Sequence, residues 1–192
     1  IMDQFVSVLG NQNEALFLNT ANRNYELIPI FKDYKFVIID SNTQRILSDS
    51  NFNQKKELCY SAAKNMNVEN LCVKSKIGEH DIQSLSDDEL SVSKHVIEEN
   101  IRVIKAAQFL KSNGAEEFGK LMTESHMSLS KYYKVSTLEL DKLVNLANSF
   151  GALGSKLTGA GFGGAIVTLV KKELVEELKK YILDNYPNAK FI

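Results

Sequence analysis

A glycine-dense segment towards the C-terminal end places the strongest constraint on how this chain can fold. Four of the six residues in 159–164 are glycines, and the segment separates two strand-like runs, 153–158 and 165–170. Glycine adopts positive φ at little steric cost, so such a backbone can turn sharply or bring its N–H groups close to phosphate oxygens. The sequence therefore leaves two readings open, a ligand-binding loop and a tight turn between strands.

The same segment also matches the dinucleotide-binding pattern G-x-G-x-x-G, through Gly159, Gly161 and Gly164. That pattern requires a helix after the loop, so that the helix N-terminus faces the pyrophosphate. Here the loop runs into the β-branched, strand-like residues 165–170. A protein-kinase glycine loop does lie between strands, but it needs H-R-D and D-F-G motifs downstream, and the sequence up to Ile192 contains neither. Both of these readings are excluded.

Apolar periodicity in the rest of the chain predicts strands first, then helices, then a strand–loop–strand–helix unit. The polar segment 41–51 is predicted as a loop, 67–79 as irregular, and the run 36–39 as a strand buried on both faces. Ser86–Glu89 and Ser136–Glu139 are capping-box patterns that open helices. The predicted strands are 15–18, 25–31, 36–39, 153–158 and 165–170, and the predicted helices are 2–9, 52–66, 86–112, 115–130, 136–147 and 172–185. This order favours an α+β fold.

Charge and cysteine content exclude several classes of protein. The formal net charge is -1, which argues against a nucleic-acid or acidic-membrane partner. The apolar run 165–170 is too short to cross a bilayer. The two cysteines, Cys59 and Cys72, are expected to be free core thiols in a reducing, cytoplasmic environment. Because both ends of the sequence lie inside periodic patterns, we expect the chain to be part of a longer protein.

Four further side chains are candidate site residues. His80, His95 and His126 show no metal-ligand spacing, so no metal site is expected, and His126 is predicted to be a packed or hydrogen-bonded histidine. Asp3 lies in the first turn of the helix predicted at 2–9, where the helix dipole favours a carboxylate by about 0.3–1 kcal/mol. It is either a catalytic carboxylate or a charge that complements the helix end.

Taken in order, segments along nearly the whole chain resemble galactokinases of the GHMP kinase superfamily. Residues 1–5 are similar to that family's G-I-M-D-Q segment, and 48–53 to its sugar-side loop S-x-S-E-Y-N. Thr158–Gly164 resembles the third GHMP motif, a glycine loop that helps to shape the cleft for nucleotide and substrate. The other matching segments are 41–42, 94–100, 125–129, 133–136 and 139–141.

The resemblance implies the C-terminal part of the GHMP kinase fold, with helices on a mostly antiparallel sheet. Residues 1–31 would end the N-terminal lobe, and 32–192 would form the C-terminal domain. It implies Asp3 as the catalytic carboxylate beside the reacting sugar hydroxyl, Phe52 as a second sugar contact, and a cleft loop made of Gly159, Ala160, Gly161, Phe162, Gly163 and Gly164. The implied substrates are galactose and ATP, and Mg²⁺ with its ligands and the phosphate loop would lie in a missing N-terminal half.

The departures from the family pattern keep other functions open. Phe52 stands where galactokinases usually carry a tyrosine that contacts the sugar, Lys55 and Lys56 replace arginines, and Ala165 replaces a common cysteine. One lost hydroxyl removes about 0.5–1.5 kcal/mol of binding, so a different sugar preference is one alternative. A non-catalytic, galactokinase-like sugar-sensing regulator is another. The isolated chain is expected to be inactive as a kinase, and its oligomeric state is not readable from the sequence.

Overall fold

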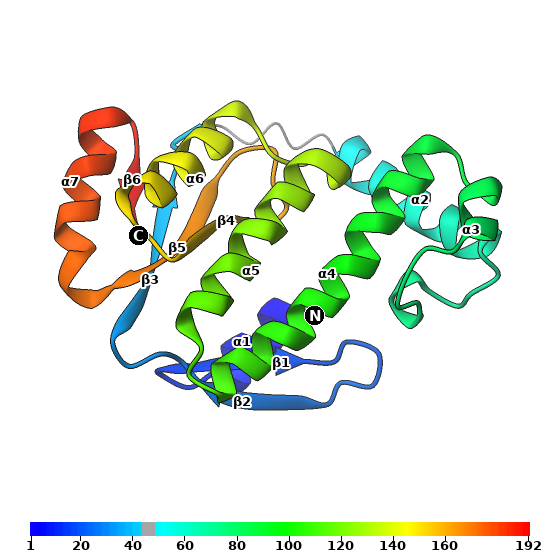
Figure 1. The fold of residues 1–192 in the computed structure, drawn as a ribbon, viewed down its shortest axis with the longest axis horizontal. Helices are drawn as coiled ribbons and strands as arrows, with labels where there is room; N and C mark the ends of the chain where they lie inside the picture. Colours follow the sequence, from blue (N-terminus) through cyan, green and yellow to red (C-terminus); the bar gives the residue numbers. More distant parts are fainter. Residues whose placement is uncertain (44–48) are drawn as a thin grey trace.

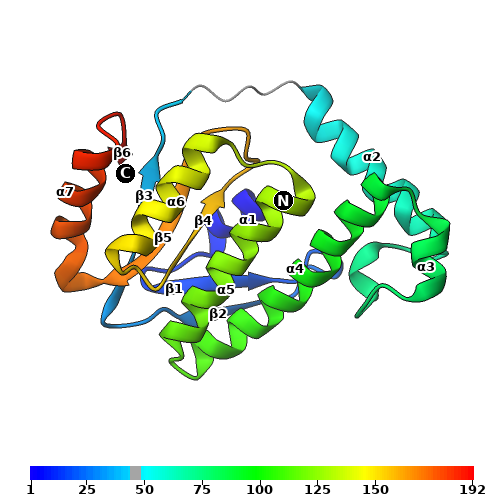
Figure 2. The same cartoon turned by 45° about the horizontal axis from the view of Figure 1, so that its top comes forward.

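The structure, a computed structural model, describes residues 1–43 and 49–192, and all side chains among them except those of 49–52. It has two antiparallel sheets, a hairpin of β1 and β2 and a four-stranded sheet in the order β4-β5-β3-β6 (Figures 1 and 2). This confirms the α+β class. The strands are β1 (Glu14–Leu18), β2 (Tyr25–Pro29), β3 (Tyr34–Asp40), β4 (Gly154–Thr158), β5 (Ala165–Lys171) and β6 (Lys190–Phe191). The α-helices are α1 (Met2–Leu9), α2 (Asp49–Asn65), α3 (Glu79–Ser84), α4 (Asp87–Lys111), α5 (Ala115–Ser128), α6 (Leu138–Phe150) and α7 (Val175–Asn185).

The centre of the four-stranded sheet is occupied by β3, although its neighbours come from the end of the chain. It pairs with β5 from Tyr34 opposite Lys171 to Asp40 opposite Ala165. On its other side it pairs with the short strand β6, through Ile39 and Phe191. The edge strand β4 joins β5 as a hairpin. On both of its sides, β3 thus pairs with strands that lie far from it in the sequence.

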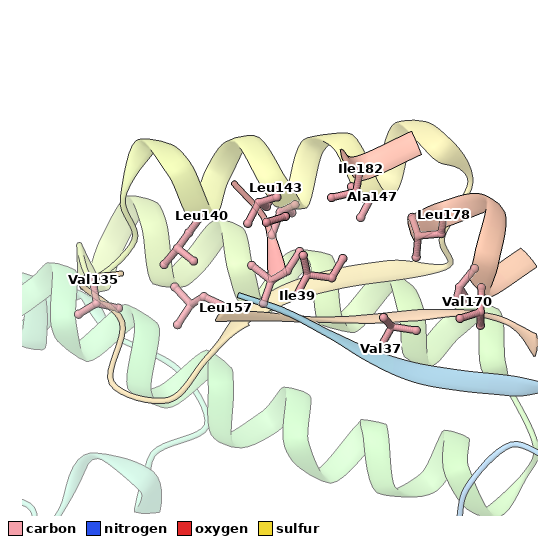
Figure 3. Packing of buried hydrophobic residues seen from close by; sticks show 14 residues of the cluster. Val37, Ile39, Val135, Leu140, Leu143, Ala147, Leu157, Val170, Leu178 and Ile182 are labelled. Atoms are coloured by element: carbon pink, nitrogen blue, oxygen red, sulfur yellow. The ribbon is translucent and has the colours of Figure 1, made fainter. Parts of the chain in front are cut away.

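One face of this sheet is covered by α6 and α7, which bury the main hydrophobic core (Figure 3). The core forms because alternate residues of each strand point to the same face, while the apolar residues of α6 recur at helical spacing. From the sheet it contains Val37, Ile39, Leu157, Ile166 and Val170, and from the helices Leu140, Leu143, Val144, Ala147, Val175, Leu178 and Ile182.

The opposite face is covered in part by α5, which lies against β4 at very short range. A Cβ added to Gly154 would overlap the backbone of Gly119, and one added to Gly119 would overlap the carbonyl of Leu153. Two glycines therefore let the helix and the strand touch backbone to backbone. The long helix α4 packs along α5, and α2 and α3 lie at the far end of α4 (Figures 1 and 2).

Local sequence rules located most of the element ends. The predicted capping box at the start of α4 is confirmed, since the Glu89 N–H donates to Ser86 Oγ and the Ser86 N–H donates to the Glu89 carboxylate. The predicted helix at 2–9 and the hairpin of β1 and β2 are also present. The second capping box is wrong by one residue, because the N-cap of α6 is Thr137, whose Oγ1 accepts the Leu140 N–H.

Several other predictions need correction. The strand β3 is not buried on both faces, because α5 packs chiefly on β4 and leaves Ile38 36% exposed. The predicted polar loop 41–51 is too long, since α2 begins at Asp49; residues 44–48 lie outside the described part. The segment 67–79 contains a 3₁₀ turn, η1 (Leu71–Val73), and the start of α3. Cys72 is free but exposed, so only Cys59 is partly buried as a core thiol.

Two short elements complete the chain. A π-turn, η2 (Leu129–Tyr133), continues α5 where a plain helix to 130 was predicted, and a 3₁₀ turn, η3 (Lys172–Leu174), precedes α7. In the described ranges, none of the helices has the length and apolarity needed to span a bilayer.

Candidate functional site

The glycine segment forms the connection of the β4–β5 hairpin. Thr158 and Ala165 are opposite each other at the ends of the two strands, and residues 159–164 join them. Positive φ is found at Gly159, Gly161, Phe162, Gly163 and Gly164. L-residues with a side chain rarely adopt this conformation, so the glycines are required by the path of the loop.

The middle of this loop is held by the segment that follows the π-turn η2. The Phe162 N–H donates a hydrogen bond of 2.7 Å to the carbonyl oxygen of Val135. Gly161 is buried, and a Cβ at that position would overlap the same carbonyl oxygen. Gly159 and Ala160 are exposed and form the open crest of the loop. One side of the loop is therefore tightly packed while its crest faces solvent.

The end of the loop is fixed by Ser41, directly after β3. The Ser41 N–H and its Oγ both donate to the carbonyl oxygen of Gly164, at 2.9 and 2.7 Å, and the side chain is fully buried. The Tyr186 hydroxyl donates to the carbonyl of Ser41. The sequence singled out Ser41–Asn42 only as a matching segment, whereas the structure shows that Ser41 anchors the loop.

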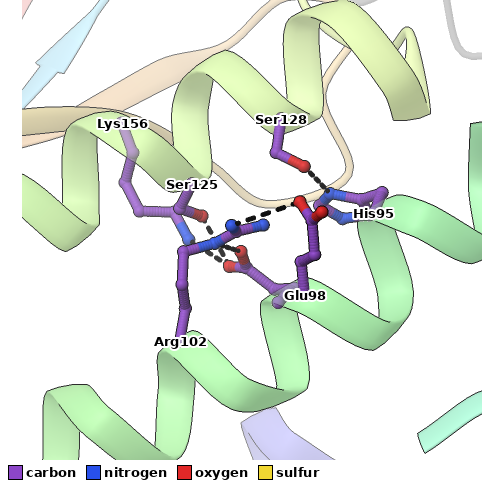
Figure 4. Close-up of polar contacts among 7 residues, drawn as sticks. His95, Glu98, Arg102, Ser125, Ser128 and Lys156 are labelled. Carbon is purple, nitrogen blue, oxygen red and sulfur yellow. Dashed lines mark hydrogen bonds and ion pairs between the residues drawn. The ribbon is translucent and has the colours of Figure 1, made fainter. Parts of the chain in front are cut away.

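Beside β4, a partly buried ionic network joins α4, α5 and the strand (Figure 4). Glu99 Oε1 accepts hydrogen bonds from Ser125 Oγ at 2.5 Å and from Lys156 Nζ at 3.1 Å, and Glu99 Oε2 accepts one from Arg102 Nε at 2.8 Å. Burial acts most strongly on the Glu99 carboxyl and would raise its pKa, but the charge of Lys156 and the three hydrogen bonds outweigh it and lower the pKa to about 2. Glu99 is therefore ionised at neutral pH.

A pocket of about 240 Å³ lies between the β1–β2 hairpin and helices α4 and α5, beside this network. Glu99, Arg102 and Lys156 lie at its lining, but most of its wall is apolar, for example Phe17 and Leu110. The pocket is thus mostly apolar, with the charged groups of the network in its lining.

Two of the histidines, His95 and His126, are buried and lie within hydrogen-bonding distance of neighbouring groups. His126 is buried and hydrogen-bonded, which confirms the prediction from the sequence. His95 Nδ1 lies 2.9 Å from Ser128 Oγ, and burial lowers its pKa to about 4, so His95 is neutral (Figure 4). Within 1–43 and 49–192, no group of three or more His, Cys, Asp or Glu side chains is placed to hold a metal ion.

The other two predicted site residues lie on separate helices. Asp3 is in the first turn of α1, with an exposed side chain, and its carbonyl accepts a hydrogen bond from Ser7 Oγ. Phe52 lies in the first turn of α2, and its side chain is outside the described part. In the described residues, no hydrogen bond or ion pair links Asp3 to the glycine loop. The structure thus brings the loop residues together but, among the residues that it describes, does not join Asp3 to them.

The helix α1 that carries Asp3 is unusual in having no buried residue. Its apolar side chains Met2, Val6 and Val8 are 64%, 49% and 80% exposed. An exposed apolar face of this kind is typical of a surface that packs against further protein.

Comparison with known proteins shows similarity to one kinase superfamily. Residues 106–188 match the family model "GHMP kinases C terminal". The chain is 35% identical over 188 residues to a galactokinase of Thermotoga maritima, and 38% identical over 194 residues to one of Clostridium acetobutylicum. These alignments cover 97% of this chain and 53% and 50% of the relatives. The chain therefore spans about half the length of the curated relatives it matches.

Solved structures give the same picture. A Lactococcus lactis galactokinase complexed with galactose superposes with a TM-score of 0.88 at 29% identity, covering 100% of this chain and 53% of that one. L. major mevalonate kinase, in complex with R-mevalonate, superposes with a TM-score of 0.57 at 18% identity, covering 93% and 46%. The second similarity shows a shared fold only.

Proposed function

We propose that this chain, which matches the family model "GHMP kinases C terminal" and aligns with about half the length of galactokinases, is part of an ATP-dependent galactose kinase. The reaction is transfer of the γ-phosphoryl group of ATP to the anomeric hydroxyl of galactose, which gives galactose 1-phosphate. The observation that carries the proposal is the close superposition, over the whole chain, on a galactokinase that holds galactose.

Asp3 is proposed as the residue that acts on the sugar. A carboxylate in the first turn of a helix interacts favourably with the helix dipole. In the complete protein it would accept a hydrogen bond from the reacting hydroxyl, orient it, and take up its proton as the phosphoryl group is transferred. Asp3 is exposed here, and α1 has an apolar face free to pack against the rest of the protein.

The glycine loop is proposed to form one wall of the nucleotide and substrate cleft. Its exposed crest at Gly159 and Ala160 offers backbone N–H groups without bulky side chains, and its buried side is held rigidly by Val135 and Ser41. Mg²⁺, when bound, would neutralise charge on the ATP phosphates, and we propose its ligands in the N-terminal half. The domain boundary is proposed between residues 31 and 32.

The full-length protein should phosphorylate galactose in the presence of ATP and Mg²⁺. Mass spectrometry of the product identifies galactose 1-phosphate, and the same assay with other hexoses measures sugar preference. If the protein phosphorylates another sugar but not galactose, this result would favour a related kinase with a different sugar preference. Specific sugar binding without any turnover would favour the sugar-sensing regulator.

Residues 1–192 alone should show no kinase activity, because phosphoryl transfer depends on a phosphate-binding loop and a positioned metal, which we place in the other half. The measurement is ADP release by the purified chain with ATP, Mg²⁺ and galactose, with the full-length protein as positive control. Turnover clearly above a blank would contradict this division of labour.

Phe52→Tyr in the full-length protein should lower the KM for galactose. The new hydroxyl restores a hydrogen bond worth about 0.5–1.5 kcal/mol, which corresponds to about a 2- to 10-fold change. The KM for ATP, measured in the same assay, is the internal control and should change much less. An equal effect on both constants, or on neither, would show that Phe52 has no part in sugar recognition.

A further inference from the structure

The carboxylate of Asp141, on α6, is shared by three separate parts of the chain. Its Oδ1 accepts hydrogen bonds from Ser136 Oγ at 2.6 Å and from His126 Nε2 at 3.0 Å, and its Oδ2 accepts one from Ser130 Oγ at 3.1 Å. One side chain thus joins helix α5, the π-turn η2 and the segment before α6. Two of these contacts form connections, here called routes, from Asp141 to the glycine loop. The first runs through His126 and the second through Ser136.

The first route runs through His126 to the strand that enters the loop. Since Nε2 donates its hydrogen to Asp141, Nδ1 carries a lone pair, and it accepts the Leu157 N–H at 3.2 Å. Leu157 lies on β4, the edge strand of the sheet, one residue before Thr158. The buried imidazole therefore satisfies a backbone N–H that the sheet itself leaves unpaired on its open edge.

The second route runs through Ser136 to the middle of the loop. Ser136 is bonded to Asp141 and directly follows Val135, whose carbonyl oxygen accepts the Phe162 N–H. The same carbonyl lies against Gly161. Displacement of Ser136 would therefore move the surface on which the loop rests.

We propose that Asp141 and His126 are positioning residues that hold the glycine loop at both its entry and its centre, and so set the shape of the nucleotide cleft. The proposal rests on the proposed kinase function, because the cleft role of the loop is part of it. Neither residue touches substrate in this account. Each acts through the backbone of Leu157 or Val135.

Protonation of His126 would break the first route, which is the hydrogen bond between its Nδ1 and the Leu157 N–H. A proton on Nδ1 converts the acceptor of the Leu157 N–H into a donor, so that hydrogen bond is lost. The charged groups around the ring are Asp141 on α6, Lys156 on β4 and, bonded to Lys156, Glu99 on α4. Burial is the largest influence on His126 and lowers its pKa below the ordinary 6.5, with Lys156 acting in the same direction and Asp141 against it.

The sign of the pH dependence follows from that lowered pKa. The unfolded chain takes up a proton at His126 near pH 6.5, before the folded protein does. The free energy of unfolding contributed by neutral His126 is therefore fully present above pH 6.5 and falls as the pH decreases below it. We expect the loop to loosen in the same direction.

A pair of amide substitutions separates the two hydrogen bonds of His126. The amide of asparagine reaches the position of Nδ1, and that of glutamine the position of Nε2. In the full-length protein, His126→Gln should increase amide hydrogen exchange at Leu157 about tenfold, and His126→Asn should leave it nearly unchanged. His126→Gln should also raise the KM for ATP more than it lowers kcat. Exposed His80 provides the matched control, and His80→Gln should change neither quantity.

The wild-type protein should also show faster exchange at Leu157 as the pH falls below 6.5, after correction for intrinsic exchange, and both amide variants should lack this step. Asp141→Asn keeps the side-chain shape and should increase exchange at Leu157 and Phe162 together. If His126→Gln fails to fold, Asp141→Asn provides the test of the proposal.

Unchanged exchange at Leu157 in His126→Gln, or an equal increase throughout β3 and β5, would overturn the proposal. The first result would mean that the bond does not hold the strand, and the second that His126 merely stabilises the domain. Exchange is measured without turnover. A wild-type protein that fails to phosphorylate galactose would therefore refute the proposed function, while exchange still decides whether the two residues hold the loop.

Discussion

Asp3→Asn in the full-length protein should lower kcat by about 10²- to 10⁴-fold, the usual contribution of a positioned acid–base group. The substitution keeps the shape of the side chain but removes its negative charge and nearly all of its proton affinity. Binding of ATP should change little, because we place the phosphate contacts elsewhere. The measurement is single-turnover and steady-state kinetics on the purified variant, with its melting curve recorded in parallel.

The alternative role of Asp3, complementing the helix end, predicts a different result. It allows a loss of stability of at most about 1 kcal/mol with normal turnover. Glu116, an exposed carboxylate in the first turn of α5, is the matched control. Glu116→Gln removes the same kind of helix-end charge and should leave kcat close to wild type. A similar kcat for Asp3→Asn would end the catalytic assignment.

Gly161→Val should abolish activity and lower the free energy of unfolding by on the order of 2–5 kcal/mol. Two causes act together. Gly161 has a φ of +81°, which a β-branched residue adopts only with strain, and its Cβ would overlap the carbonyl oxygen of Val135. Thermal unfolding and ADP release on the full-length variant measure both effects. A variant with the wild-type melting temperature would show that the loop does not depend on packing against Val135.

Gly159 supplies the control for that experiment, because it shares a φ of +81° but is exposed at the crest of the loop. Gly159→Ala should cost about 1 kcal/mol of stability and leave the protein folded. If the crest forms the cleft wall, its kcat/KM for ATP should still fall at least tenfold. Normal kinetics would favour the simple reading of the segment as a turn between strands.

The sequence predicted those features that depend on neighbouring residues. The hairpin around 159–164 follows from glycines between two β-branched runs, and the start of α4 from Ser86 and Glu89 three positions apart. The fold class follows from the order of such elements. The matching segments also indicated a resemblance to one superfamily, and the relatives found by comparison align with nearly the whole chain.

Features that depend on tertiary contact were missed. Glu99, Ser125 and Lys156 come from three elements, and no spacing in the sequence shows that they meet at one carboxylate. The anchoring of Gly164 by Ser41 joins residues 123 positions apart. Phe36–Ile39 has the composition of a doubly buried strand, but its burial depends on where α5 packs, which its own residues do not determine. For Asp3 and Phe52, a role in the site stays a prediction.

The central place of β3 in the sheet has a consequence for how the protein is made. Tyr34 pairs with Lys171, and β6 follows later still. At translation rates of 5–20 residues per second, β3 emerges roughly 7–26 s before its first partner strand. During that time its apolar face has no sheet to join, so the nascent domain needs protection from aggregation until β5 and β6 have left the ribosome. A ribosome stalled shortly after α6 would hold a chain with every helix up to α6 but no four-stranded sheet.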